Sequence, residues 1–137
     1  MRFIMNIDVP DVRQAAAFYE SAFGLRTSRL LFEGTVAEMA GGPVPIYLLQ
    51  KEPGSPAFRG AGERRRFERH WTPVHLDVIV DAIEPALERA LRAGATLEGR
   101  VQDFAWGRLA VLGDPFGNGI CLLQWQGRGY DEVQDQD

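Results

Sequence analysis

Residues 45–50 read Pro-Ile-Tyr-Leu-Leu-Gln and residues 119–124 read Gly-Ile-Cys-Leu-Leu-Gln, so four of six positions are identical when the two segments are aligned. Both segments are short apolar runs typical of buried strands. Earlier in each half, residues 3–9 and 74–80 alternate like strands and align with one another along their whole length. The repetition of both patterns indicates that the chain contains two related halves.

Each alternating segment runs into a helical pattern with a recognisable start. Asp11 and Gln14 have the spacing of a capping box, in which side chains satisfy the exposed N–H groups of the first turn. Asp81 and Glu84 offer a similar start in the second half. Apolar residues at helical spacing predict that one face of each helix packs on a sheet. These residues are Val12, Ala15, Ala16, Tyr19 and Phe23, then Ile83, Leu87, Ala90 and Leu91, and the glycines that end the helices are Gly24 and Gly94.

Two further short strands are predicted in each half before its repeated last strand. The order strand, helix, three strands therefore occurs twice, and it predicts an α+β fold. In this fold two βαβββ modules form a curved, mostly antiparallel sheet around a cavity. The additional strands are expected at residues 29–32 and 35–40, then 97–101 and 108–112.

Composition sets the expected boundaries. We expect one domain over residues 1–127, with module 1 at about 1–50, a linker at 51–70 and module 2 at about 71–127. The linker is rich in Gly, Pro and Arg and has no period, which predicts a connection or a mobile flap. Residues 128–137 are expected to form an acidic, unstructured C-terminal tail.

Bulk properties argue against several classes of protein. The net charge of −4 disfavours nucleic acid as a partner, and no apolar stretch is long enough to form a membrane helix. The run Arg64, Arg65, Arg66 is interpreted as solvated linker rather than a phosphate-binding patch. The single cysteine, Cys121, cannot form an internal disulfide, and the first residues lack the features of a secretory signal. We therefore expect a cytoplasmic protein.

Three short motifs connect the chain to a known superfamily. The first helix reads Asp11-Val-Arg-Gln-Ala-Ala-Ala-Phe-Tyr19 and ends in Phe23-Gly24-Leu25, and Asp114-Pro-Phe-Gly-Asn118 precedes the last strand. With the paired modules, these motifs resemble the vicinal oxygen chelate superfamily over nearly all of residues 3–125. The superfamily includes glyoxalase I, extradiol dioxygenases, methylmalonyl-CoA epimerase, and bleomycin- and fosfomycin-resistance proteins. The resemblance implies a homodimer, but scaffold motifs do not choose among these functions.

The resemblance also implies where a metal would be bound. In members that use a metal, one residue at the start of the first strand and one in the last strand of each module hold it, and the corresponding residues are Ile4, Tyr47, His75 and Cys121. Only His75 is a usual ligand for the O- and N-rich sites of these enzymes, and Ile4 has no donor atom. Tyr47 could bind iron and Cys121 could bind zinc. We expect no metal of the usual kind and no other cofactor, with a divalent metal as the minor alternative.

Strand alternation places Asn6 and Asp8, and His75 and Asp77, on the face opposite the residues that pack under the helices. Polar groups in a filled core would each cost about 1–3 kcal/mol without partners, so a wet ligand cavity explains them better. His75 and Asp77 are the catalytic candidates, because a carboxylate can orient an imidazole for acid-base chemistry. The alternative is a histidine that is hydrogen-bonded within the sheet.

Further ligand-binding candidates lie on the last strands and on one hairpin. Trp125 and Cys121 share a face of one strand, and Tyr47 lies in the matching strand, where aromatic rings would form an apolar wall. Trp106 and Arg108 open a strand and are candidates to hold an aromatic or carboxylate-bearing ligand. The alternatives are core packing, an inert buried thiol and a solvated hairpin.

Two functions follow from these residues. The first is a glyoxalase/bleomycin-resistance-like protein that binds a small hydrophobic or aromatic molecule in the sheet cavity without the usual metal. The alternative is a glyoxalase-like lyase or isomerase, or a dioxygenase, in which His75 and Asp77 move protons with or without a divalent metal. A regulatory domain with a filled hollow is a third class, and the inward polar residues count against it.

Overall fold

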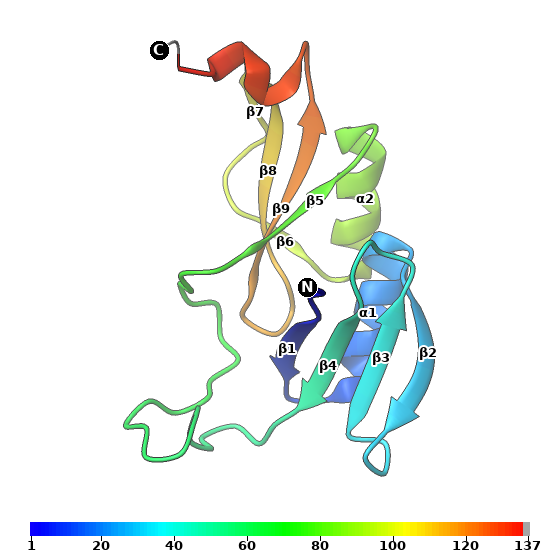
Figure 1. The fold of residues 1–137 in the computed structure, drawn as a ribbon, viewed down its shortest axis with the longest axis vertical. Helices are drawn as coiled ribbons and strands as arrows, with labels where there is room; N and C mark the ends of the chain where they lie inside the picture. Colours follow the sequence, from blue (N-terminus) through cyan, green and yellow to red (C-terminus); the bar gives the residue numbers. More distant parts are fainter. Residues whose placement is uncertain (136–137) are drawn as a thin grey trace. The chain divides into compact units, whose positions relative to one another are not determined.

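In the computed structural model, which describes residues 1–135, the chain divides into two compact units, Met1–Glu68 and the part that begins at Arg69. Each unit contains a strand, a helix and the remaining strands of its own sheet (Figure 1). The predicted α+β class with two βαβββ-like modules is confirmed, and the second module has one extra short strand. Residues 51–68 of the predicted linker belong to the first unit.

The elements of the first unit are β1 (Met5–Val9), α1 (Val12–Phe23), β2 (Arg26–Leu31), β3 (Val36–Ala40) and β4 (Ile46–Gln50). The strand order is β1-β4-β3-β2, with β1 parallel to β4 and the other pairs antiparallel. Four residues of the predicted stripe of α1 are buried, whereas Phe23 is half-buried. They pack with Leu48 and Ile46 of β4, which are buried on the face that α1 covers.

The start and the end of α1 lie where the sequence predicts them. The Asp11 carboxylate accepts hydrogen bonds from the backbone N–H groups of Arg13 and Gln14, both at 2.9 Å. Gly24 ends the helix in the left-handed conformation, with φ of 69°. A further acceptor was not predicted: the Gln50 side-chain oxygen receives the Val12 N–H at 3.1 Å. The last strand of the unit therefore also caps its helix.

The elements of the second unit are β5 (Leu76–Ile79), α2 (Ile83–Ala93), β6 (Thr96–Leu97), β7 (Gln102–Phe104), β8 (Gly107–Gly113), β9 (Gly119–Trp125) and the 3-10 helix η1 (Gly129–Val133). The strand order is β5-β9-β8-β6, and β7 pairs with β8. The single strand predicted at residues 97–101 is wrong, because β6 and β7 flank an interruption there. Gly99 has φ of 82°, a left-handed conformation that ends an extended run.

The predicted cap of α2 is also wrong. The N-cap residue is Ala82 rather than Asp81, and a methyl group cannot accept a hydrogen bond. The Gln124 side-chain oxygen instead receives the Ile83 N–H at 2.8 Å. Glu84, the expected partner in a capping box, forms an ion pair with Arg108. The two glutamines of the sequence repeat thus have the same structural role in the two units.

The C-terminal segment is more structured than predicted. Residues 129–133 form η1, and the Tyr130 ring packs edge-on against Trp125, with 4.6 Å between ring centroids. Tyr130 also contacts Trp106, at 5.3 Å. These aromatic contacts stabilise a segment whose acidic composition predicted an unstructured tail. Positions 136 and 137 of that tail lie outside the described residues.

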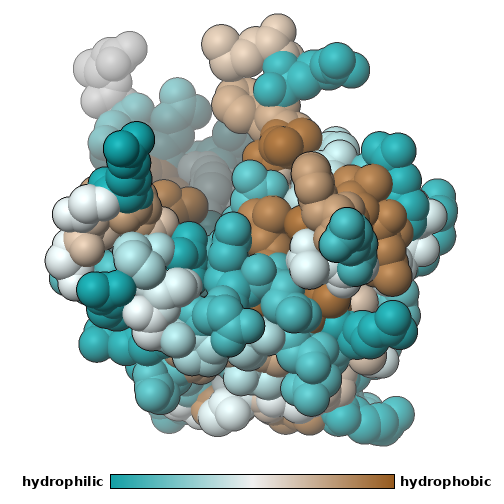
Figure 2. Space-filling view, turned by 90° about the horizontal axis from the view of Figure 1, so that it is seen from below, coloured by the Kyte–Doolittle hydropathy of each residue, from teal (hydrophilic) through white to brown (hydrophobic). Residues whose placement is uncertain are grey.

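Each sheet has one face turned away from the helix of its own unit, called here its helix-free face. Strand register aligns Asn6, Tyr47 and Glu38 across that face of the first sheet. Hydrophobic side chains are also exposed among hydrophilic ones on the molecular surface, as Figure 2 shows for the face in view. Within the described residues, no helix is both long enough and apolar enough to span a membrane.

Candidate functional site

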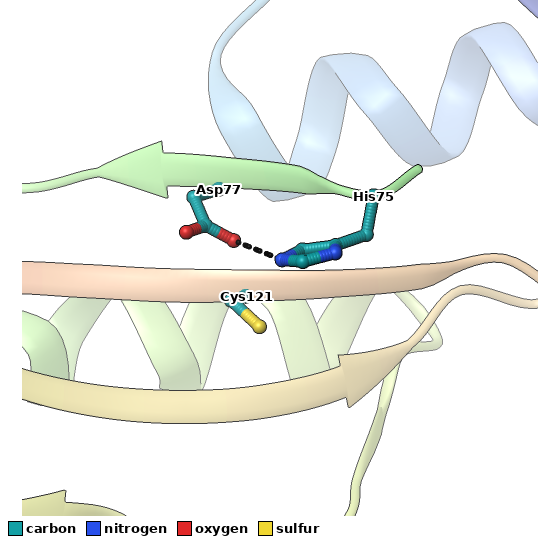
Figure 3. A group of neighbouring side chains, drawn as sticks. All are labelled: His75, Asp77 and Cys121. Atoms are coloured by element: carbon teal, nitrogen blue, oxygen red, sulfur yellow. Dashed lines mark ion pairs between the residues drawn. The ribbon is translucent and has the colours of Figure 1, made fainter. Parts of the chain in front are cut away.

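The helix-free face of the second sheet gathers three side chains that can carry chemistry. β5 is parallel to β9, and Asp77 lies opposite Cys121 in their register. His75 is two residues before Asp77, so strand alternation places both on the same face. Figure 3 shows all three side chains together on the side of the sheet away from α2. The structure therefore brings together three of the residues selected from the sequence.

The histidine and the aspartate form a pair. His75 Nε2 lies 3.1 Å from Asp77 Oδ1, and the two side chains are 56% and 37% exposed (Figure 3). One donor atom from each of these residues and one from Cys121 all lie within 4.8 Å of one another. The pair has the geometry of an imidazole oriented by a carboxylate, which general acid-base catalysis uses.

The environment of Cys121 lowers the reactivity of its thiol near neutral pH. Burial raises the pKa of this thiol to about 11, with smaller contributions from the charge and the hydrogen bond of Asp77. Because the thiolate is the nucleophilic form, a protonated thiol is a poor nucleophile. Cys121 is therefore a poor candidate for a nucleophile.

A pocket of about 180 Å³ opens beside His75 and Cys121. Its remaining wall contains one cation, an aromatic ring, a hydroxyl group, two aliphatic side chains and a glycine, from Arg69, Trp71, Thr72, Val111, Ile120 and Gly119. Arg69 is not among the residues predicted to form a site, because it falls in the predicted linker, residues 51–70. Trp71 and Thr72, which come directly after this linker, are also not among the predicted binding residues.

Two glycines make room for Arg69 on this face. Gly113 and Gly119 are paired in the register of β8 and β9. A Cβ atom on Gly119 would lie 2.8 Å from Arg69 Nη2, and one on Gly113 would lie 3.3 Å from Arg69 Cδ. The guanidinium forms an ion pair with Glu98 and donates to the carbonyl of His70. Glycines facing each other on adjacent strands are the sequence signal that could have indicated this close approach.

The equivalent face of the first sheet is occupied by its own ion pairs. The Tyr47 hydroxyl donates to Glu38 at 2.9 Å, and Arg29 binds the same carboxylate at 2.8 Å. Hydrogen bonds from Arg29, and then from Ser28 and Tyr47, hold the pKa of Glu38 below its usual range. The hydrogen bond to Glu38 raises the pKa of Tyr47. Tyr47 is therefore engaged in a network within its own sheet, while Asn6 is exposed on β1.

Asp8 is engaged by the segment that was interpreted as a solvated linker. Arg65 Nε lies 2.7 Å from Asp8 Oδ2, and the Arg65 guanidinium also donates to the carbonyls of Pro56 and Ala57. An antiparallel bridge joins Pro56 to Arg64. The interpretation of this arginine run as only solvated is therefore wrong for Arg65, because its carboxylate partner lies 57 positions away in the chain.

The structure places Trp106, Arg108 and Trp125 away from the described lining of the pocket. Trp106 stacks on Phe104 at 4.9 Å with an interplanar angle of 8°. Arg108 pairs with Asp103 at 2.7 Å and also with Glu84. Trp125 contacts η1, as described above. These three residues form an aromatic and charged cluster at one end of the second unit rather than part of the His75 site.

Comparison with known proteins identifies the architecture. The family model described as a glyoxalase-like domain matches residues 4–123. The chain belongs to this glyoxalase-like domain family. A fosfomycin resistance protein from Listeria monocytogenes is similar in structure, with a TM-score of 0.71 and 15% identity over 98% of this chain and 97% of that one. A glyoxalase/bleomycin resistance protein/dioxygenase family enzyme from Burkholderia phytofirmans gives a TM-score of 0.67 and 19% identity over 90% and 97% of the two chains.

Curated relatives of this glyoxalase-like protein match only part of its length. An uncharacterized protein of Mycobacterium bovis is 42% identical over 54 residues, which cover 39% of this chain and 36% of the relative. An uncharacterized protein of Mycobacterium tuberculosis gives the same identity over 32% of its length. With identities of 15% and 19%, the two structural neighbours establish the fold of the family and not a shared reaction.

The metal set implied by the superfamily does not fit the residues of this glyoxalase-like protein. Of the four positions, Ile4 is an exposed aliphatic side chain without a donor atom. Tyr47 is already bound to Glu38. His75 and Cys121 remain, and they belong to the second unit, beside Asp77. Two donors of four are too few to offset the dehydration of a hard divalent cation.

Proposed function

We propose that this glyoxalase-like protein binds a small hydrophobic or aromatic molecule in the pocket of its second unit, without the metal that is usual in its superfamily. The observation that carries this proposal is the pocket beside His75, whose wall combines aliphatic and aromatic groups with a few polar ones. Binding sites for small organic molecules have this composition, since apolar contacts supply affinity and polar groups fix orientation.

The dimensions of the pocket limit its guest. A volume of about 180 Å³ is below the roughly 300 Å³ of the smallest typical ligand pockets, so the guest is a small molecule or a small part of a larger one. Trp71 is 81% exposed at the rim and offers a ring face for stacking. A compact aromatic compound with one hydrogen-bonding group matches these features.

Thermal unfolding in the presence of candidate compounds tests the proposal. The panel contains small substituted aromatics together with bleomycin and fosfomycin, which appear in the names of the structural neighbours. A compound that binds the folded state raises the Tm. Val111→Phe should abolish the increase by filling the pocket, whereas Val101→Phe, outside the pocket lining, should preserve it. Equal increases in both variants would place the binding site elsewhere.

The His75–Asp77 pair favours a second candidate, a glyoxalase-like lyase or isomerase. A carboxylate 3.1 Å from an imidazole nitrogen fixes the orientation of a general base. The hemithioacetal of methylglyoxal and glutathione is the first substrate to test, because a lactoylglutathione lyase from Agrobacterium tumefaciens shares the fold, with a TM-score of 0.60, 18% identity and 90% and 92% of the two chains covered. His75→Ala should abolish turnover if the residue is catalytic, and it should change only ligand affinity if the protein is a binder.

We also propose that the protein is a homodimer in the cytoplasm. Large apolar side chains are exposed on and near β5, including Val74 at 78% and Ile79 at 59%. Burial of such exposed apolar side chains against a second copy of the chain would remove them from water. Light scattering during gel filtration should give twice the 15.3 kDa mass of the chain. In a reducing compartment Cys121 stays a free thiol, consistent with its unpaired state.

A further inference from the structure

We propose that the second unit alone holds a zinc ion through His75, Asp77 and Cys121. One donor atom from each residue lies within 4.8 Å of the other two. Asp77 is not among the four positions that the superfamily uses, and all three of these donors lie in the second unit. The site therefore differs from the superfamily set in its ligands and in its confinement to β9, β5 and the residue just before β5.

The donor atoms are close to the separation that zinc requires. Zinc bonds of about 2.0–2.3 Å in a tetrahedron place neighbouring donors about 3.3–3.8 Å apart. His75 and Asp77 are already 3.1 Å apart, so the remaining adjustment is a closure of roughly 1 Å toward the sulfur. His75 and Asp77 are both partly exposed and can rotate to make this closure. Cys121 lies opposite Asp77 in register and provides the fixed point.

The chemistry of the donors favours zinc over magnesium and calcium. A thiolate, an imidazole and a carboxylate are all zinc ligands, whereas magnesium and calcium prefer sites made only of oxygen atoms. A thiolate and a carboxylate together balance the charge of the ion. The fourth tetrahedral position is open, and His75 and Cys121 both line the pocket, so water or an entering molecule can occupy it.

The inference does not depend on the identity of the small molecule, because metal alone tests it. Untagged, metal-free protein is titrated with Co²⁺ as a spectroscopic probe and with Zn²⁺ by calorimetry. We expect one ion per chain and a sulfur-to-cobalt charge-transfer band in the near ultraviolet that Zn²⁺ removes. His75→Ala and Asp77→Asn should each weaken zinc binding by at least about tenfold. Loss of a residue that only supports a metal ligand already weakens binding by about this factor, and loss of a ligand itself should weaken it at least as much. Cys121→Ser should abolish the band.

Two matched controls use residues outside the proposed site. His70→Ala removes the other histidine of the chain, and Tyr47→Phe removes the hydroxyl at one of the superfamily positions. Both variants should bind zinc as the wild-type protein does. Circular dichroism of each metal-free variant checks that it folds, and the band of the wild-type protein reports sulfur ligation without any substitution.

Three results would overturn the proposal. The first is wild-type protein that binds no zinc when the ion is present at 100-fold excess over micromolar protein, or binds cobalt without the sulfur band. The second is unchanged affinity in Asp77→Asn, which would remove the carboxylate from the site. The third is a loss of binding in Tyr47→Phe equal to that in His75→Ala, which would move the site to the superfamily positions.

Discussion

The two sheets have the same strand order along their main path but differ in the side chains that are paired on their helix-free faces. In the first sheet, Glu38 of β3 lies opposite Tyr47 of β4 and binds it. In the second sheet, Val111 of β8 lies at the matching place opposite Cys121 of β9 and offers no polar partner. On the first face Tyr47 and Glu38 consequently bind each other, whereas the second face has a thiol, an imidazole and a carboxylate beside a pocket. Different residues at these two equivalent positions thus leave a hydrogen-bonded pair on one sheet and a pocket beside a thiol on the other.

The starts of the two helices show the same kind of difference. Both receive a hydrogen bond from the glutamine at the end of the last strand, Gln50 or Gln124. The first helix also has the Asp11 cap, whereas Ala82 provides no side-chain acceptor for the second. Both helices have the long-range cap, but only the first also has a side-chain cap from its N-cap residue, so the stability of the second helix depends more on its sheet.

The largest expected effect concerns the turns before the last strands. Asp114 is buried and accepts hydrogen bonds from the N–H groups of Phe116 and Asn118 and from the Asn118 side chain, each at 2.8 Å. Asp114→Ala should lower the free energy of unfolding by about 3 kcal/mol, since it leaves buried donors unpaired. Urea denaturation measures the loss.

Asp114→Asn is the control for this effect, because its amide oxygen still accepts some of these hydrogen bonds, and it should cost less. The corresponding turn of the first unit, residues 41–45, reads Gly-Gly-Pro-Val-Pro and has no carboxylate to remove. A loss below about 1 kcal/mol in Asp114→Ala would show that the two turns are stabilised alike.

The second effect is on the reactivity of Cys121, on the helix-free face of the second sheet. In metal-free protein at pH 8, iodoacetamide should alkylate Cys121 about tenfold more slowly than an ordinary thiol. The pKa of about 11 reduces the thiolate population, and the greater nucleophilicity of the remaining thiolate offsets only part of that reduction. Asp77→Asn should accelerate alkylation, because it removes a negative charge that raises this pKa. A rate that stops rising near pH 9, the ordinary pKa of a thiol, would contradict this account.

The third effect distinguishes the glutamine caps. Gln124→Ala should destabilise the protein by about 1 kcal/mol, because the N–H of buried Ile83 loses its acceptor. Gln50→Ala should lower the free energy of unfolding by a smaller amount, since Asp11 still caps the first helix. Paired urea denaturation of the two variants measures the difference. Equal losses of stability in the two variants would mean that the Asp11 cap does not compensate for the loss of the glutamine.

The smallest effect is expected at the aspartates that precede the helices. Asp11→Ala should lower the free energy of unfolding by about 1 kcal/mol, because the first helix loses its side-chain cap. Asp81→Ala should change stability by less than about 0.5 kcal/mol, because Ala82 and not Asp81 is the N-cap residue. Thermal unfolding of both variants under identical conditions is sufficient to compare them. An equal loss of stability in Asp81→Ala and Asp11→Ala would support the capping box that the sequence predicted for the second helix.

The amino-acid sequence alone determined the repeat, the order of the elements and the glycines that end both helices. These features depend on local patterns, namely apolar periodicity, a capping aspartate before the first helix and glycines that tolerate a left-handed backbone. The same alternation placed His75 and Asp77 on one face, because side chains two positions apart in a strand point the same way. Family membership followed from motifs within the same local range.

Only the tertiary structure decided which of the candidate residues share a site. It joined Arg65 to Asp8 across 57 positions and Gln124 to Ile83 across 41 positions. In the tertiary structure Arg69 also lies against a pair of glycines, and Trp106 and Trp125 lie outside the pocket lining. Such partners meet through strand register and chain packing, which depend on the free energy of the whole fold, so no local pattern in the chain encodes them.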